Sequence, residues 1–262
     1  MNASMAPEKR EPHSSPNGAS SVRSWGVSHK GSVRPVNQDR FLARDDLGVW
    51  LVADGAGGHE GGGVAAQALV EEFGRLQAGL SNEAIVRECA GALQKTHLFL
   101  RALAGDHEEA TGITTAAVLI LDTEKLACQW VGDSRVYQFR NGQLTLLTHD
   151  HSLVQEMVDA GRITASESER HPQRNIITRA VGANCDTLQI ATLTMRAEPG
   201  DLYLMCSDGL WGTLSQAQIT AAFELSPKAI ADALVDAALA SHATDNVTAV
   251  VVSVPLHERC EQ

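Results

Sequence analysis

The feature that most constrains this chain is an apolar run over residues 49–53, which leads directly into Asp54-Gly55-Ala56-Gly57-Gly58-His59. Five consecutive apolar residues are typical of a strand buried on both faces. The glycines allow the backbone to approach a ligand closely, and a carboxylate at the end of a buried strand is well placed to bind a hard cation. An Asp-Gly pair is also typical of a hairpin turn, so this segment alone leaves both interpretations open.

The composition limits what the chain can bind. Its 262 residues carry a formal net charge of −11 and no basic stripe, which argues against nucleic acid as a partner. No apolar run is long enough to span a membrane, and the N-terminus lacks the apolar core of a signal peptide. The five dispersed cysteines favour a reducing compartment, and we expect Cys89, Cys128 and Cys206 to be buried. These features predict a cytoplasmic protein that does not bind membranes, and we expect a monomer.

The ends of the chain differ in composition from its middle. Residues 1–21 are rich in Ser, Pro and Asn without apolar periodicity, which predicts a disordered N-terminal tail. Residues 22–255 are predicted to form a single domain, and the polar residues 256–262 a frayed C-terminus.

Within the domain, the patterns of helices and strands come in blocks. Helices are predicted over 64–80 and 82–103, with Val64 and Leu103 on their buried stripes. Strands are predicted over 115–121, 125–131, 135–140, 143–147, 187–195, 202–206 and 247–254, and further helices over 153–160, 219–223 and 228–240. This order predicts an α+β fold, a central antiparallel β-sandwich flanked on both sides by helix pairs.

Four aspartates share one context along the chain. Asp54, Asp133 and Asp208 follow predicted strands, and Asp245 immediately precedes one. A single aspartate at such a position is usually a cap or a turn residue. Four that converge would repel one another unless a cation neutralised them. Carboxylates without a cluster of Cys and His favour magnesium or manganese over zinc.

Two further residues have side chains suited to phosphate chemistry. Arg34 carries a planar fork that can donate to two phosphate oxygens. His59, just past the glycine-rich loop, is suited to act as a general acid. Taken alone, each is better explained as an ordinary surface residue.

Seven segments, taken in order, resemble the metal-dependent Ser/Thr protein phosphatases of type 2C, the PPM family, in its compact bacterial form. The resemblance covers residues 25–254, nearly all of the predicted domain. The segments are RPVNQD (34–39), DGAGGH (54–59), VGDSRVY (131–137), DHSLV (150–154), NIITRAVG (175–182), CSDGLW (206–211) and DNVT (245–248). Each is weak alone, whereas all seven in family order are specific. The PPM-type fold that they imply agrees with the sandwich predicted above.

The resemblance implies a set of metal ligands. Asp54 matches the aspartate that bridges two metal ions, and Gly55 matches the residue whose carbonyl binds one of them. Asp208 and Asp245 match the remaining carboxylates on the first metal, and Asp133 matches a ligand of the third metal seen in bacterial members. The implied cofactors are two catalytic Mn²⁺ or Mg²⁺ ions, together with this third ion.

The resemblance also implies roles for residues around the metals. Arg34 matches the arginine that grips the phosphate, and His59 matches the proposed general acid. Asp39 and Asn246 lie in matched segments and are expected to contact the metal ligands and hold them in position. Residues 152–175 match the flap, a variable segment beside the active site that is linked to substrate choice.

Three residues depart from the family pattern. Gln38 stands where many members carry glutamate, which removes a negative charge near the second metal. Ala56 replaces the usual methionine, and Ile113 stands where the family has glycine. None of the three changes removes a principal ligand, so an active enzyme is expected.

The implied activity is hydrolysis of phosphoserine and phosphothreonine in proteins by a metal-activated water, without a covalent intermediate. The implied partners are phosphoproteins and a bacterial Ser/Thr kinase that the enzyme opposes. A cysteine-based phosphatase needs an arginine six positions after its cysteine, and none follows Cys128, Cys185 or Cys206 at that spacing. The glycine-rich loop also lacks the Gly-Lys-Ser/Thr of a nucleotide-binding P-loop. A non-catalytic module that binds phosphoproteins remains the alternative, weakly suggested by Gln38 and Ile113.

Overall fold

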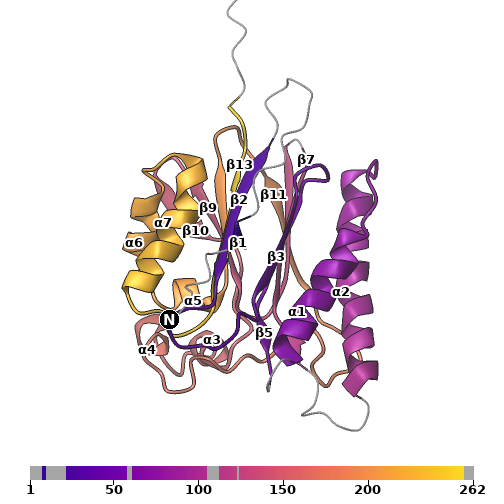
Figure 1. The fold of residues 1–262 in the computed structure, drawn as a ribbon, viewed down its shortest axis with the longest axis horizontal. Helices are drawn as coiled ribbons and strands as arrows, with labels where there is room; N and C mark the ends of the chain where they lie inside the picture. The colour runs from indigo at the N-terminus through magenta and orange to yellow at the C-terminus, as the bar shows by residue number, and fades with distance from the viewer. Residues whose placement is uncertain (1–7, 10–21, 58–60, 105–111, 123, 257–262) are drawn as a thin grey trace, which may run out of the picture.

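The computed structural model describes residues 8–9, 22–57, 61–104, 112–122 and 124–256. Two antiparallel sheets face each other (Figure 1). The first has the order β1 (Glu8–Lys9), β2 (Arg23–His29), β13 (Val247–Ser253), β12 (Leu202–Cys206), β9 (Arg135–Arg140) and β10 (Gln143–Leu146). The second has the order β11 (Ala191–Arg196), β8 (Lys125–Val131), β7 (Ala116–Asp122), β4 (Val49–Ala53) and β3 (Arg40–Arg44). A short pair, β5 (Gly55–Ala56) and β6 (Ile113–Thr114), extends beyond β4.

Helices cover the outer face of each sheet (Figure 1). The five-stranded sheet is covered by α1 (Gly61–Gly74) and α2 (Asn82–Ala104), and the six-stranded sheet by α5 (Asp208–Trp211), α6 (Gln216–Ala222) and α7 (Pro227–Ala240). The short helices α3 (Leu153–Asp159) and α4 (Ala165–Ser168) lie at one end. The predicted α+β sandwich between helix pairs is therefore confirmed. Within the described residues, no helix combines the length and apolar character needed to cross a bilayer.

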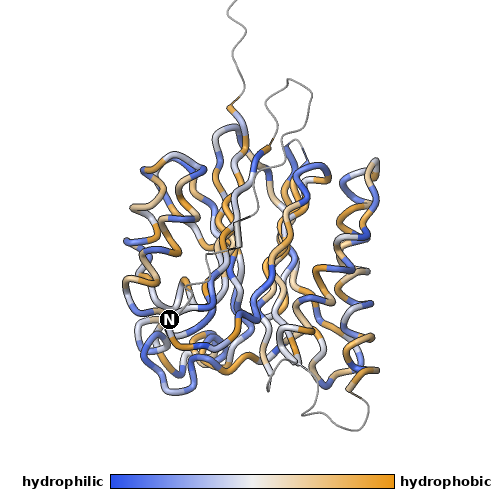
Figure 2. The backbone as a smooth tube through the Cα atoms, in the orientation of Figure 1, coloured by the Kyte–Doolittle hydropathy of each residue, from blue (hydrophilic) through white to orange (hydrophobic). Residues whose placement is uncertain are grey.

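The core consists of three apolar layers, and Figure 2 shows apolar residues along both sheets. One layer lies between the sheets, and one lies under each set of helices. Strand β4 is buried at all five positions because the facing sheet covers one side and α1 and α2 cover the other. Cys89, Cys128 and Cys206 are buried in these layers, as predicted.

Some element boundaries differ from the predictions. Helix α1 ends at Gly74 rather than near residue 80, since glycine is a poor helix former. Strand β11 begins at Ala191 rather than 187 because its partner β8 ends one residue after the facing Trp130. In the segment predicted as a tail, Glu8 and Lys9 pair with the edge strand β2, and the remainder of 1–21 lies outside the described residues, as does 257–262.

The predicted burial of Val64 and Leu103 was wrong. Their side chains are 51% and 55% exposed, whereas Leu69 and Phe73 on α1 and Leu93 and Leu100 on α2 are buried as helix periodicity requires. Val64 is one turn from the start of α1, and Leu103 is one residue from the end of α2. Both therefore lie at the same end of this helix pair.

The topology brings the strand-end aspartates to one end of the sandwich. Strands β4 and β8 are both antiparallel to β7, so they run in the same direction and Asp54 and Asp133 follow them at the same edge. Strands β12 and β13 are antiparallel neighbours, so Asp208 after β12 lies beside Asp245 before β13. In Figure 1 this end carries β5, α3 and α4.

Candidate metal and phosphate site

Asp54 lies where β4 passes into β5, and its backbone is fixed by Thr114 at the end of β6 and by Thr115 before β7. Its N–H donates to Thr115 Oγ1 at 3.0 Å, and its carbonyl accepts from the Thr115 N–H at 2.8 Å and from the Thr114 hydroxyl at 3.0 Å. Gly55 then pairs with Thr114 instead of reversing the chain. The hairpin interpretation of Asp54-Gly55 is therefore wrong.

Gly55 is required for close packing of backbone at this point. A Cβ atom there would lie 2.1 Å from the Gly62 carbonyl oxygen and 2.8 Å from the Gln38 carbonyl oxygen. The start of α1 and the segment before β3 therefore both contact the β4–β5 junction. This packing leaves no room for a side chain at position 55.

The carboxylates raise one another's affinity for protons. Burial, together with neighbouring aspartates, raises the pKa of Asp133 to about 8, that of Asp39 to about 7 and that of Asp208 to about 6. Burial, followed by the charges of Asp39 and Asp208, raises the pKa of Asp54 well above its ordinary value. Asp54 also makes a hydrogen bond to Asp208 that favours the charged form of the latter. A divalent cation would relieve this repulsion.

Asp39 joins the two strands that carry Asp208 and Asp245. The carboxyl group is buried, and its Oδ2 accepts from Ser207 Oγ and Thr248 Oγ1, each at 2.7 Å. Its Oδ1 is buried without a hydrogen-bond partner among the described residues. An unpartnered buried carboxylate oxygen within an acidic cluster fits a bound cation or its water ligands.

Arg34 contacts the outermost carboxylate of the cluster. Its Nε donates to Asp245 Oδ1 at 2.9 Å and its Nη2 to Asp245 Oδ2 at 2.7 Å, so the pair is bidentate. The Arg34 side chain remains 55% exposed. The guanidinium thus neutralises Asp245 and lies at the mouth of the acidic site.

Asn246 fixes the loop that carries Arg34. Its side-chain oxygen accepts from the Gln38 N–H at 2.8 Å, and its Nδ2 donates to the carbonyls of Lys30 at 2.9 Å and Val36 at 3.0 Å. The amide therefore holds both ends of this loop.

Asp133 is supported by residues to which the sequence analysis gave no role. Trp211 Nε1 donates to the Asp133 carbonyl at 3.0 Å, and the Arg135 guanidinium lies 3.6 Å from the centroid of the Trp211 ring. Arg135 also forms a bidentate pair with Asp150, with an Nη2–Oδ2 distance of 2.7 Å. Asp133, Arg135, Asp150 and Trp211 all lie in the segments that resemble the family, but their spacing in the sequence does not show that they contact one another.

The predicted flap, 152–175, contains α3 and α4 and is anchored at its base. The His151 N–H donates to the Gly132 carbonyl at 2.9 Å, and the His151 carbonyl accepts from the Thr178 N–H at 2.8 Å. The Leu153 N–H donates to the Ile176 carbonyl at 2.9 Å. The base of this segment is therefore fixed beside Asp133.

The carboxylate and carbonyl oxygens at this end of the sandwich are donors that hard divalent cations prefer. In this structure they do not surround a common point. No group of three His, Cys, Asp or Glu side chains in the described part of the chain already has metal-ligand spacing. His59 lies outside the described residues, so its role as a general acid stays a prediction.

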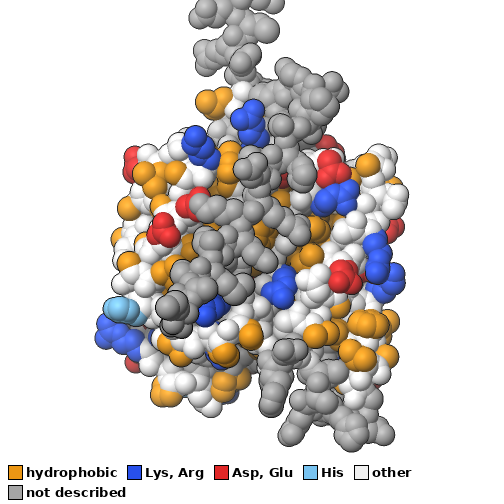
Figure 3. Space-filling model, viewed as in Figure 1, with side chains coloured by type: hydrophobic (Ala, Val, Ile, Leu, Met, Phe, Trp, Pro, Cys, Tyr) orange, Lys and Arg blue, Asp and Glu red, His pale blue; other side chains and the backbone are white. Residues whose placement is uncertain are grey.

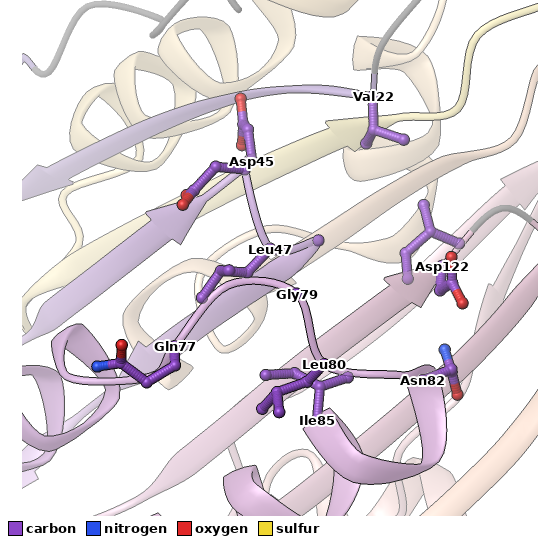
Figure 4. Close-up of a pocket in the computed structure, with 12 residues that line it drawn as sticks. Val22, Asp45, Leu47, Gln77, Gly79, Leu80, Asn82, Ile85 and Asp122 are labelled. Atoms are coloured by element: carbon purple, nitrogen blue, oxygen red, sulfur yellow. The ribbon is translucent and has the colours of Figure 1, made fainter.

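A cavity of about 300 Å³ lies at the end of the sandwich opposite the acidic cluster (Figure 4). It is lined in part by Asp45, Leu80 and Ile85. Asp45 Oδ1 accepts from Ser24 Oγ at 2.6 Å and from Trp50 Nε1 at 2.8 Å, so this carboxylate supports the fold. The acidic end of the sandwich is therefore the better candidate site.

In chemical terms, an acidic cluster beside an exposed arginine is suited to divalent cations and phosphate. The chain belongs to the protein phosphatase 2C family, whose sequence profile matches residues 26–243. It is 36% identical over 231 residues to the serine/threonine protein phosphatase PstP of Mycobacterium tuberculosis. That match covers 87% of this chain, which spans only 44% of the length of PstP.

Solved structures of family members have the same fold. The structure of PppA, described as a key regulatory component of T6SS in Pseudomonas aeruginosa, matches with a TM-score of 0.83 and 35% identity, over 89% of this chain and 98% of PppA. The catalytic domain of PstP in complex with two manganese ions matches with a TM-score of 0.81 and 30% identity, over 90% and 99% of the two chains.

Proposed function

We propose that this chain hydrolyses phosphoserine and phosphothreonine in proteins by attack of water, without a covalent intermediate. The observation that carries the proposal is that Asp54, Asp133, Asp208 and Asp245 lie at one end of the sandwich beside Arg34, and that burial and neighbouring carboxylates raise the pKa values of Asp54, Asp133 and Asp208. We propose that Asp54, the Gly55 carbonyl, Asp208 and Asp245 hold two Mn²⁺ or Mg²⁺ ions, and that Asp133 holds a third. The manganese-bound relative supports this cofactor.

Bound ions at such a site supply hydroxide from water at neutral pH and positive charge for the phosphoryl oxygens. The two N–H donors of Arg34 that pair with Asp245 lie in one plane at the mouth of the site, and they would become available to two phosphoryl oxygens when a metal ion is bound by Asp245. Asn246 holds the loop that carries Arg34, which keeps the guanidinium beside the site. His59 is proposed to protonate the leaving oxygen.

The cysteines support a mechanism without a covalent intermediate. Burial raises the pKa of Cys89 and Cys128 to about 12 and raises the pKa of Cys206 as well. A thiol in such surroundings is not a nucleophile at neutral pH. Cys206, the nearest to the site in sequence, therefore has a structural role.

The substrate class can be tested with three synthetic peptides of identical sequence carrying phosphoserine, phosphothreonine or phosphotyrosine. With Mn²⁺, we expect phosphate release from the first two at rates at least about tenfold above the third, because the relatives that the chain matches are serine/threonine phosphatases. Such a preference would reflect how the peptide binds, since a phenoxide leaves more readily than an alkoxide. Release from none of the peptides, together with tight phosphopeptide binding, would favour the non-catalytic alternative.

Arg34 gives a second prediction, because its guanidinium and a metal ion compete for Asp245. Arg34→Ala should bind Mn²⁺ about two- to fivefold more tightly, a small gain because the ion pair is half exposed to water. It should also lower kcat/KM for phosphopeptides by at least about tenfold through loss of the phosphate contact. Calorimetric titration and steady-state kinetics measure the two effects. Arg34→Lys, which keeps the charge without the fork, serves as the control, and weaker Mn²⁺ binding by Arg34→Ala would contradict the competition.

The physiological partners follow from the proposed chemistry. We propose that the chain opposes a bacterial Ser/Thr kinase by removing the phosphates that the kinase adds, and that it acts as a cytoplasmic monomer. Support for this class of partner comes from the family membership. A phosphoproteome comparison of a deletion strain with its parent would identify the substrates.

A further inference from the structure

Exposed apolar side chains gather at the end of the α1–α2 layer that adjoins the acidic cluster. Figure 3 shows hydrophobic side chains over this end of the two helices. The exposed residues are Val64 on α1, Leu98, Phe99 and Leu103 on α2, and Val33 and Val36 on the loop after β2. Apolar side chains gathered in this way typically mark a contact surface.

A groove of about 570 Å³ runs through this surface. Val64 and Ala68 of α1, Phe99 of α2 and Val36 contribute its apolar walls. Phe99 is 54% exposed, which leaves much of its ring free to contact a ligand.

The groove is continuous with the candidate metal site. Gln38 lines it, and the Gln38 N–H is held by Asn246, the neighbour of Asp245. Gly63 also lines it, one residue after Gly62, whose carbonyl packs against Gly55. A polypeptide that places a phosphate at Arg34 would therefore reach the groove within a few residues.

Two charged residues line the groove, and hydrogen bonds hold both in place. Arg40, at the start of β3, donates from Nη1 to the carbonyls of Asn37 at 2.9 Å and Asp39 at 2.8 Å, and from Nε to Gln67 Oε1 on α1 at 3.1 Å, so its guanidinium lies between the acidic site and α1. Glu71 lies two turns further along α1 than Val64 and accepts from Gln67 at 3.1 Å. Arg40 thus offers a positive charge near the place where an anionic phosphopeptide carries its phosphate, and the apolar walls line the same groove.

We propose that this groove binds the polypeptide of the phosphoprotein substrate and takes a large apolar side chain, a few residues from the phosphorylated Ser or Thr, between Val64 and Phe99. The inference rests on the proposed function and extends it to substrate choice. A substrate polypeptide must cover surface next to the phosphate site, and this surface combines continuity, apolar walls and a matching charge. Phe99 and Val64 are specificity-determining residues in this arrangement.

The test uses alanine-based peptides that carry one phosphothreonine, with a single leucine moved through each flanking position. Their kcat/KM values are measured by phosphate release, and their Kd values by fluorescence anisotropy of labelled analogues with a non-hydrolysable phosphonate. Leucine at one or two positions should lower Kd about tenfold relative to the all-alanine peptide, because its side chain is buried on binding.

The variants Phe99→Ala and Val64→Ser should remove this leucine preference and leave hydrolysis of p-nitrophenyl phosphate within about twofold of the parent chain. Both positions are exposed, so the fold should tolerate the changes. Leu80→Ser is the matched control, since Leu80 is an exposed leucine between α1 and α2 at the opposite end of the layer (Figure 4). It should keep the preference intact.

Several outcomes would overturn the inference: no leucine position tightens binding, the preference survives in both variants, or p-nitrophenyl phosphate hydrolysis falls in parallel. If the two variants sediment differently from the parent chain but bind the peptides equally well, the surface contacts a second copy of the chain instead. If the parent chain hydrolyses nothing but still binds the phosphonate peptides with a leucine preference lost in Phe99→Ala, the proposed function fails and the groove assignment stands.

Discussion

Replacing Asp54 with asparagine should lower phosphatase activity by about three orders of magnitude or more, because the residue proposed to hold the metal ions would lose its charge. The substitution is nearly isosteric, and the backbone hydrogen bonds of Asp54 to Thr115 do not depend on its carboxylate. The variant should therefore fold. Phosphate release from a phosphothreonine peptide at saturating Mn²⁺ measures the loss.

Asp54→Asn should also stabilise the metal-free chain, since a neutral amide no longer repels Asp39 and Asp208. A rise in Tm in the presence of EDTA, combined with lost activity, separates a functional residue from a merely structural one. Asp122→Asn, at an exposed aspartate at the end of β7, is the control and should change neither quantity. An Asp54→Asn variant that retains activity would contradict the assignment of the bridging ligand.

The metal-free chain should lose stability as the pH rises from about 5 to 8. The pKa values of Asp39, Asp208 and Asp133 are raised to about 7, 6 and 8 in the fold, so the folded state binds more protons than the unfolded chain in this range. A raised carboxyl pKa stabilises the fold below the unfolded value, and this contribution is lost as the pH passes the folded value. We expect a loss of about 3 kcal/mol or more over this range.

Thermal unfolding in EDTA at pH 5.5 and pH 8 measures this effect, and the same scans with Mn²⁺ provide the control. Bound cations should replace the protons, so the Mn²⁺-dependent increase in Tm should be larger at pH 8 than at pH 5.5. A Tm that is independent of pH in EDTA would show that the carboxylates do not repel one another as their burial and proximity imply.

The sandwich was predictable because its buried strands have unambiguous patterns. The apolar run of β4 and the Asn141-Gly142 turn between β9 and β10 each indicate their structure locally. The burial of Val64 and Leu103 was not predictable, since helix periodicity shows which residues share a face but not where the neighbouring sheet ends. Val64 lines the proposed substrate groove, and Leu103 lies about one helical turn after Phe99, which also lines it.

The candidate site was predictable to a smaller extent. Strand-end positions and the family resemblance together indicated the aspartates, but not that Asp39 is held by Ser207 and Thr248, or that Arg34 pairs with Asp245. Such contacts join residues about 170 to 210 positions apart in sequence. They depend on how the two sheets are placed relative to each other, which no local pattern encodes.

The central claim is that the acidic end of the sandwich is a metal-dependent phosphatase centre. The most direct test is hydrolysis of p-nitrophenyl phosphate by the metal-stripped chain as Mn²⁺ is added back. We predict no hydrolysis in EDTA and a rate that rises with Mn²⁺ to saturation. Hydrolysis that persists in EDTA, or that never appears at saturating Mn²⁺, would contradict the claim.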